Sequence, residues 1–208
     1  MKIETFVTGI IGTNTYVAYN ETTKEAVLVD PAACTKKLMH FIEEEGLSMK
    51  AVLLTHGHFD HIGGLEKTKA QTGAKVYIYA DDADTLTSAG KNLSTMVGQP
   101  MNPGPADVLL RDGDEVEISP NIKLTTIHTP GHTVGSCCFV GEDVIFSGDT
   151  LFEGSIGRTD FPGGSYENMM KSLSRLMTYD DDMTVLPGHG ENTDIAYERA
   201  RNPFIARG

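Results

Sequence analysis

The stretch THGHFDHIGG, residues 55–64, places three histidines and one aspartate within six positions. It directly follows the apolar run AVLL, residues 51–54, which is typical of a buried strand. Neutral imidazoles and a carboxylate have no apolar-packing reason to converge, whereas imidazole nitrogens and carboxylate oxygens are ligands of Zn²⁺ and also of Fe and Mn. The stretch therefore indicates a metal site in a loop at the end of a strand.

Three further polar loops follow apolar runs in the same way: TPGH at 129–132, SGDT at 147–150 and LPGH at 186–189. Rigid folds often hold reactive side chains in such loops. A single histidine in a Pro-Gly-His turn is more often a capping or surface residue. These loops therefore support a metal site only in combination with the histidine-rich stretch at 55–64. Together the four loops supply seven candidate ligands: His56, His58, Asp60, His61, His132, Asp149 and His189.

Seven ligands are too many for one tetrahedral ion. Two metal ions, each with three ligands of its own and bridged by one carboxylate and one water, account for all seven residues. Such a pair of ions lowers the pKa of bound water and polarises the oxygen of the group under attack, so the set favours a hydrolytic enzyme. The two remaining histidines, His40 and His128, are expected to be structural.

The composition narrows the possible partners. The chain has 208 residues and a formal net charge of -12, and its 17 Lys and Arg residues are scattered, so no nucleic-acid partner is expected. No apolar run approaches the roughly 20 residues that cross a bilayer, and the N-terminus has no signal-peptide pattern. We therefore expect a cytoplasmic protein without a membrane partner, folded as one domain over residues 1–208, with Cys34, Cys137 and Cys138 as reduced thiols.

The pattern of apolar residues predicts many short strands and a few helices. Strands are expected at 3–8, 15–19, 26–29, 51–54, 75–79, 108–110, 116–118, 122–127, 136–140, 144–146 and 184–186. Helices are expected at about 34–45, 64–72, 166–177 with Ser165 as N-cap, and 193–200. Residues 87–106 are expected to form a long loop, or a loop with one short helical turn. The first three strands suggest an antiparallel meander, and the whole order suggests an α/β fold of two packed sheets with helices outside.

Four motifs now carry a family resemblance: THxHxDH at 55–61, PGHTxGS at 130–136, GDT at 148–150 and PGHG at 187–190. In this order and spacing they resemble the metallo-β-lactamase superfamily. The resemblance implies an αββα sandwich, with two mixed β-sheets flanked by helices and a metal site at the sheet edge. It implies two divalent metal ions, with Zn favoured and Fe or Mn possible. It assigns His56, His58 and His132 to the first ion, Asp60, His61 and His189 to the second, and Asp149 to the bridge between them.

Within the superfamily, Asp149 argues against antibiotic hydrolysis, because class B β-lactamases do not use a bridging aspartate there. The segment GDTLFEGSIGRTDFPGG, residues 148–164, is similar to the short single-domain relatives of glyoxalase II, the hydroxyacylglutathione hydrolases. The resemblance implies hydrolysis of S-D-lactoylglutathione or a related acyl thioester by a hydroxide that bridges the metals and is oriented by Asp60. Arg158 either meets a substrate carboxylate or pairs with Asp160. We expect no C-terminal helical extension of the kind that holds glutathione in two-domain enzymes, so the thiol part of the substrate stays open.

Two other functions remain open. The stretch GRTDF at 157–161 also resembles persulfide dioxygenases, whose single iron would here be held by His56, His132 and Asp149. A metal-binding protein without catalysis would be signalled by missing ligands, and all seven are present. The sequence does not predict the oligomeric state.

Overall fold

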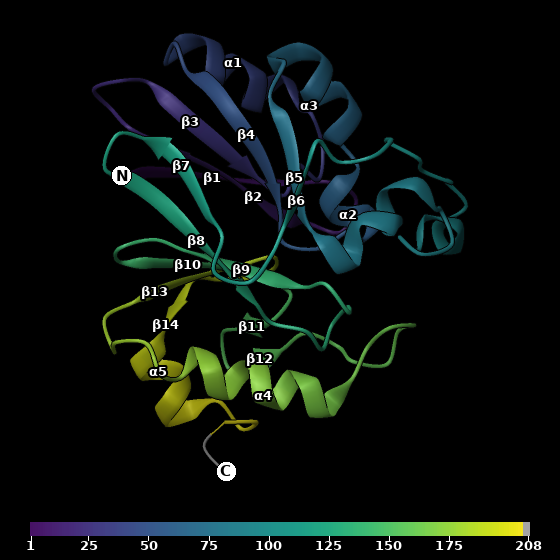
Figure 1. The fold of residues 1–208 in the computed structure, drawn as a ribbon, viewed down its shortest axis with the longest axis vertical. Coiled ribbons are helices and arrows are strands. Elements are labelled where there is room, and N and C mark those ends of the chain that lie inside the picture. The colour runs from purple at the N-terminus through teal and green to yellow at the C-terminus, as the bar shows by residue number, and fades with distance from the viewer. Residues whose placement is uncertain (206–208) are drawn as a thin grey trace.

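The computed structural model describes residues 1–205. Two six-stranded sheets pack face to face, and helices cover the outer face of each sheet (Figure 1). This is the αββα sandwich that the sequence predicts. That residues 1–208 form a single domain stays a prediction. Within the described residues, no helix is both long enough and apolar enough to cross a membrane.

The first sheet has the strand order β1-β2-β3-β4-β5-β6. Its first three strands form the predicted antiparallel meander, and β3, β4, β5 and β6 run parallel to one another. Parallel strands end at the same edge of a sheet, so the segments that follow β3 and β4 start side by side. The strands are β1 (Lys2–Thr8), β2 (Thr13–Tyr19), β3 (Glu25–Val29), β4 (Ser48–Leu54), β5 (Lys75–Tyr79) and β6 (Val108–Leu110).

The second sheet has the order β14-β13-β10-β9-β8-β7. Its strands β10 and β13 are parallel, so the GDT and PGHG loops leave the sheet at the same edge. A separate short hairpin pairs β11 (Leu151–Phe152) with β12 (Ser155–Ile156). The strands of the second sheet are β7 (Glu115–Ser119), β8 (Ile122–His128), β9 (Cys137–Val140), β10 (Val144–Gly148), β13 (Thr184–Pro187) and β14 (Thr193–Asp194).

Helices α1 (Lys36–Glu44) and α3 (Leu65–Thr72) cover the first sheet, and α4 (Tyr166–Leu176) and α5 (Ile195–Arg201) cover the second (Figure 1). The predicted N-cap of α4 is confirmed, because the Ser165 side chain accepts a hydrogen bond from the backbone N–H of Asn168.

Alternate residues of β4 face two separate apolar layers, which explains its unbroken apolar pattern. Ala51 and Leu53 pack between the sheets, whereas Val52 and Leu54 pack beneath α1 and α3. On α4, the side chains of Met169, Leu173 and Leu176 are buried against the second sheet.

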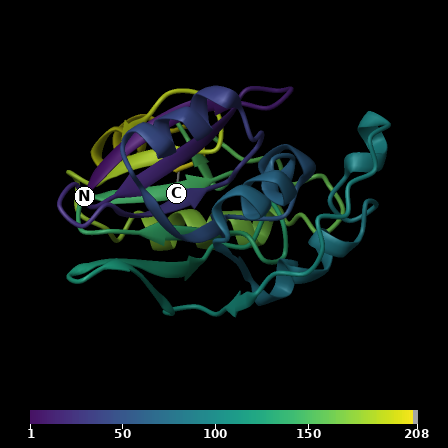
Figure 2. The ribbon, with the colours of Figure 1, turned by 90° about the horizontal axis from the view of Figure 1, so that it is seen from above.

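The structure adds elements that the sequence analysis missed. A one-turn helix, α2 (Phe59–Ile62), lies inside the histidine motif, and the 3-10 helix η1 (Ala80–Thr87) follows β5. The 87–106 region contains one short 3-10 turn, η2 (Ser94–Val97), which confirms the predicted alternative of a loop with one short helical turn. Figure 2 shows this teal segment extending on one side of the sandwich. The last helix begins at Ile195 rather than 193, because Asp194 is extended and its side chain caps the helix by accepting from the Tyr197 N–H. Such short elements are below the length at which periodicity is detectable.

Replacement of Leu173 by alanine tests the packing of α4 on the second sheet. Leu173 is 2% exposed, so Leu173→Ala should lower the free energy of unfolding by about 2–5 kcal/mol through lost contact and a residual cavity. Urea denaturation with metal held constant measures this change. Lys171→Ala, at an exposed position of the same helix, is the control and should change stability by less than about 0.5 kcal/mol. Equal effects of the two changes would contradict this packing.

Candidate metal centre

The structure brings all seven predicted ligand residues together at one edge of the sandwich. They fall into three overlapping groups whose ligand atoms lie within 4.8 Å of one another: His56, His58 and His132; His56, His61 and Asp149; and Asp60, His61 and His189. The first and third groups are the sets that the sequence analysis assigned to two separate ions. The second group places Asp149 beside members of both.

The first group consists of three buried imidazoles. The Nδ1 atom of His58 lies 2.9 Å from Nε2 of His132, and the ring centroids of both residues lie 4.8 Å from that of His56. The nitrogens of the three rings therefore face a common point.

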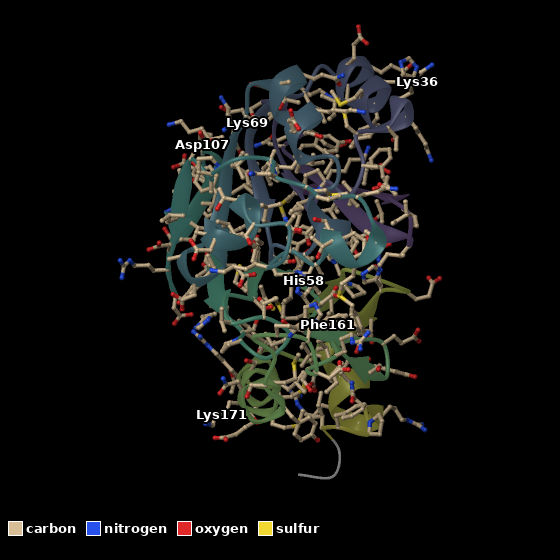
Figure 3. All side chains as sticks on the ribbon, turned by 90° about the vertical axis from the view of Figure 1, so that its right-hand side faces the viewer. Lys36, His58, Lys69, Asp107, Phe161 and Lys171 are labelled. Atoms are coloured by element: carbon tan, nitrogen blue, oxygen red, sulfur yellow. The ribbon has the colours of Figure 1, made fainter. Side chains whose placement is uncertain are left out.

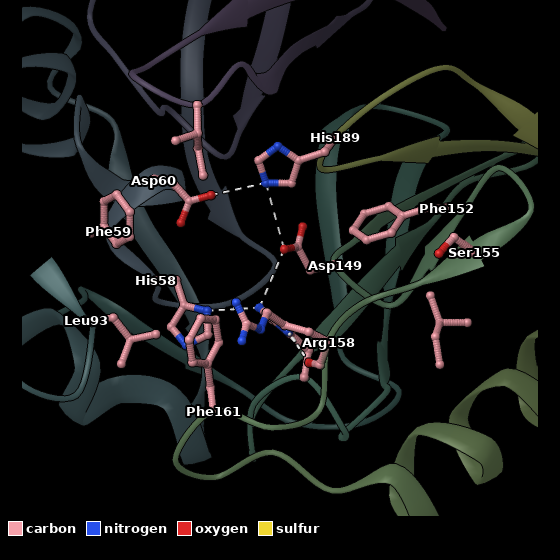
Figure 4. Close-up of a pocket in the computed structure, with 13 residues that line it drawn as sticks. His58, Phe59, Asp60, Leu93, Asp149, Phe152, Ser155, Arg158, Phe161 and His189 are labelled. Carbon is pink, nitrogen blue, oxygen red and sulfur yellow. Dashed lines mark hydrogen bonds and ion pairs between the residues drawn. The ribbon is translucent and has the colours of Figure 1, made fainter. Parts of the chain in front are cut away.

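The third group combines a carboxylate with two imidazoles. The Oδ2 atom of Asp60 lies 3.1 Å from Nε2 of His189 and 3.4 Å from Nε2 of His61. Asp149 lies between this group and the first (Figure 4). Its Oδ1 is 3.3 Å from His61 Nε2, and its Oδ2 is 3.5 Å from His132 Nε2. Asp149 thus has the position that a bridging carboxylate requires.

Unpaired buried atoms show that these residues fit a metal centre. Within residues 1–205, His56 Nε2, His61 Nε2 and Asp149 Oδ1 are buried and have no hydrogen-bond partner. A buried polar atom without a partner costs about 1–3 kcal/mol. Divalent cations would satisfy all three atoms, and a donor set of imidazole and carboxylate without thiolate suits Zn, Fe or Mn.

Outer hydrogen bonds orient the imidazoles so that the inward nitrogen keeps its lone pair. His61 Nδ1 donates to Asp30 Oδ2 at 2.9 Å, and His132 Nδ1 donates to the Arg158 carbonyl at 2.7 Å. Thr55 Oγ1 donates to Asp30 Oδ2, so it accepts from His56 Nδ1 at 3.2 Å. The sequence analysis missed Asp30 and Thr55, although Asp30 follows the apolar strand β3 just as the other candidate residues follow theirs.

The electrostatics of the centre suit cation binding. Burial lowers the pKa of His56 far below its usual value, and burial together with His132 lowers the pKa of His58 to about 3, so both rings are neutral at pH 7. Burial opposes ionisation of Asp60, but the nearby His61 and His189 lower the pKa of Asp60 below its usual range. The first group thus offers neutral imidazoles, and Asp60 offers an ionised carboxylate, which are the forms that bind metals.

A cavity of about 520 Å³ opens over Asp60, Asp149 and His189. Much of its wall is apolar, and the ring of Phe161 lies beside that of His58, with centroids 5.7 Å apart (Figure 3). Arg158 also lines the cavity, but its guanidinium donates two 2.7 Å hydrogen bonds to the carboxylate of Asp160. Of the two roles left open for Arg158, the structure therefore contains the pairing with Asp160.

The remaining two histidines lie apart from these groups. His40 pairs with Glu44 on the surface of α1, and the ring of His128 stacks on Tyr79 with centroids 4.1 Å apart.

Comparison with known proteins gives the family. The family model described as "Metallo-beta-lactamase superfamily" matches residues 8–189, a range that contains all seven candidate ligands. The chain belongs to the metallo-β-lactamase superfamily. Some relatives have names that describe hydrolases. The hydroxyacylglutathione hydrolase GloC of Haemophilus influenzae is 34% identical, and the match covers 88% of each chain. The probable metallo-hydrolase YqgX of Bacillus subtilis is 37% identical, over 99% of this chain and 98% of that protein.

Solved structures of other members of the superfamily share the fold. The structure of BLEG-1, described as a B3 metallo-β-lactamase, matches with a TM-score of 0.92 and 35% identity over 98% of this chain and 99% of that one. ETHE1 from Myxococcus xanthus matches with a TM-score of 0.84 and 30% identity, covering 100% and 85% of the two chains. TTHA1623, in a di-iron-bound form, matches with a TM-score of 0.85 and 32% identity, covering 97% and 99%. The likeness to GloC supports the glyoxalase II-like branch, and the family implies divalent metals.

A further buried carboxylate, that of Asp82, connects two of the loops that carry candidate ligands. It accepts hydrogen bonds from the N–H of Gly57 at 3.1 Å, from Thr133 Oγ1 at 2.9 Å and from the N–H of Gly135 at 2.9 Å. A Cβ at position 135 would lie 2.4 Å from the Asp82 backbone nitrogen, so glycine is needed for this approach. Gly57 lies between His56 and His58, and Thr133 follows His132. Asp82 therefore holds the first group of imidazoles in place, and no motif pointed to it.

Replacement of Asp82 should weaken metal binding without touching a ligand. Asp82→Asn turns one accepting oxygen into a donor that faces N–H groups, so we expect the affinity for zinc to fall about 10–100-fold. Competition with a chelating dye measures the affinity. Asp84→Asn is the matched control, because Asp84 is exposed and pairs only with Lys91 in the structure described. Unchanged zinc affinity in the Asp82 variant would contradict its role in holding the loops.

Proposed function

We propose that this metallo-hydrolase superfamily member hydrolyses thioesters in the manner of glyoxalase II, with S-D-lactoylglutathione or a related acyl thioester as substrate. The observation that supports this proposal most is the position of Asp149, whose two oxygens face His61 and His132. A carboxylate placed in this way fits a centre of two ions, and two ions would lower the pKa of bound water and polarise a carbonyl oxygen, as hydrolysis requires. The likeness to GloC adds support for the thioester class.

In this proposal His56, His58 and His132 would hold one divalent ion, Asp60, His61 and His189 would hold the other, and Asp149 would be available to both. When bound, the two ions would lower the pKa of water and polarise the carbonyl oxygen of the substrate. Zinc is the metal we favour, with iron or manganese as alternatives, because the ligand atoms accept all three.

The protein's own residues would orient the reactants. Asp60 lines the cavity, and its Oδ2 accepts a hydrogen bond from Thr13 Oγ1 at 3.4 Å in addition to its contact with His189. These contacts restrain the carboxylate, so Asp60 can orient the attacking water. The side chains of Phe59 and Phe161 contribute apolar surface to the lining of the cavity. Arg158, if released from Asp160, would be available to a substrate carboxylate.

A persulfide dioxygenase is the second candidate. The GRTDF stretch at 157–161 and the likeness to ETHE1 favour it, and its single iron would be held by His56, His132 and Asp149. The likeness to BLEG-1 raises antibiotic hydrolysis as well, against which Asp149 argues.

Metal content and thiol release separate these functions. We expect about two metal ions per chain, and release of thiol from S-D-lactoylglutathione or a simple acyl thioester by the metal-loaded protein. Elemental analysis and a thiol-reactive dye measure the two quantities. One iron per chain, with oxygen uptake on glutathione persulfide and no thiol release, would establish the dioxygenase instead. Turnover of a chromogenic cephalosporin would support antibiotic hydrolysis.

Asp60→Ala should abolish turnover while the fold survives. Loss of a carboxylate that orients water and holds the second ion should reduce kcat by about 10²–10⁴-fold and lower the metal content toward one ion per chain. Circular dichroism checks the fold. Asp182→Ala, at an exposed position in the turn before β13, should leave both quantities unchanged. Full activity of the Asp60 variant would overturn the two-metal assignment.

A further inference from the structure

The wall of the cavity is apolar on both sides of the metal centre. The Phe152 ring lies 6.2 Å from that of His189, and the Phe161 ring lies 5.7 Å from that of His58, measured between centroids. Figure 4 shows the two phenyl rings on opposite sides of Asp149. Four more apolar side chains complete the lining: Ile11, Phe59, Leu93 and Ile156.

The rings that line the cavity are not fully covered by the protein. Phe59, Phe152 and Phe161 come from three separate segments and are all only half-buried. Exposed aromatic surface that converges on a reactive centre is typical of small-molecule sites, where the ligand covers it. A volume of about 520 Å³ also lies in the usual range for such sites.

Cationic side chains are scarce in the lining of this cavity. Among the described residues that line it, Arg158 is the one lysine or arginine, and its guanidinium is bonded to both oxygens of Asp160 and lies 3.8 Å from the Phe161 ring centroid. The whole chain carries a net charge of -12. Glutathione carries two carboxylates and one ammonium group, and such a thiol would require free cationic partners. The cavity as built suits an uncharged, apolar group better.

We infer that the preferred substrates are thioesters with an apolar acyl group, either an aliphatic chain or a phenyl ring, rather than the hydroxyacyl thioesters of glutathione. This inference rests on the proposed thioester hydrolysis. Water adds its oxygen to the carbonyl carbon, the C–S bond breaks, and the carboxylic acid and the free thiol are the products. The acyl chain lies against the phenyl rings and Ile11.

A matched pair of isoleucines allows a test that does not endanger the fold. Ile10 and Ile11 both lie in the turn between β1 and β2, with exposed fractions of 66% and 56%. Ile11 lines the cavity, whereas Ile10 does not. Because both side chains are exposed, serine at either position should leave the fold intact.

The experiment compares acetyl, butyryl, hexanoyl and benzoyl thioesters of N-acetylcysteamine, an uncharged thiol, with S-D-lactoylglutathione on the zinc-loaded protein. Burial of acyl methylenes should raise kcat/KM by up to about four-fold per methylene, or roughly ten-fold from acetyl to butyryl. Ile11→Ser should lower kcat/KM about five-fold for the hexanoyl thioester and not for the acetyl thioester. The reason is that the hexanoyl chain would lose about half of the free energy that burial of an isoleucine side chain provides. Ile10→Ser should change neither.

The other outcomes are distinct. A flat series with S-D-lactoylglutathione as the fastest substrate would overturn the apolar preference and leave the proposed function intact. Thiol release from none of the thioesters would overturn the proposed function. Calorimetry with S-benzyl-N-acetylcysteamine, which cannot be hydrolysed, would then decide the ligand class: binding weakened by Ile11→Ser supports an apolar occupant, and absence of binding overturns it.

Discussion

The metal centre depends on the hydrogen bonds that the buried carboxylate of Asp30 accepts. It accepts hydrogen bonds from the N–H of Thr55 at 2.8 Å, the hydroxyl of Thr55 at 2.7 Å and the ring of His61 at 2.9 Å. Asp30 has a φ of 49°, in the left-handed region that aspartate, asparagine and glycine adopt more readily than other residues. Because β3 and β4 are parallel neighbours, Asp30 lies directly beside the start of the histidine motif. One carboxylate thus sets the orientation of His61 directly and that of His56 through Thr55.

The two sheets are joined at the same edge by backbone hydrogen bonds. The N–H of Cys137 in β9 donates to the Thr55 carbonyl at 2.9 Å, and the N–H of Asn14 in β2 donates to the Gly188 carbonyl at 2.8 Å. Each bond ties a loop that carries candidate ligands to the opposite sheet. A centre that gathers five imidazoles and two carboxylates opposes folding, because buried charged groups are costly without partners. These cross-sheet bonds hold the residues together, and bound cations would then add stability, since an unfolded chain has no such site.

The sequence analysis predicted the parts of the site that depend on local pattern. The THxHxDH motif is dense enough to identify four ligand-type residues, and the glycine-rich loops after strands supplied His132, Asp149 and His189. Asp30 and Asp82 were not predicted, because a single aspartate after an apolar run is also common in ordinary turns. Their role depends on which loops the fold brings beside them. Helix α2 and the β11–β12 hairpin were missed because two to four residues carry no period. The pairing of Arg158 with Asp160 was one of two roles that sequence spacing alone could not separate.

The packing around Asp60 is the strongest physical argument for two ions rather than one. A centre with a single iron at His56, His132 and Asp149 would leave Asp60, His61 and the partly exposed His189 without a metal ion. His61 is fully buried and Asp60 is 8% exposed, and their ligand atoms are 3.4 Å apart. Burial opposes a charge on His61, yet Asp149, Asp60 and Asp30 together raise its pKa far above the usual value. Three carboxylates that face one buried imidazole form a field that attracts positive charge. A second divalent ion would supply that positive charge. Metal binding would then explain why Asp60, His61 and His189 converge, as it does for the first group.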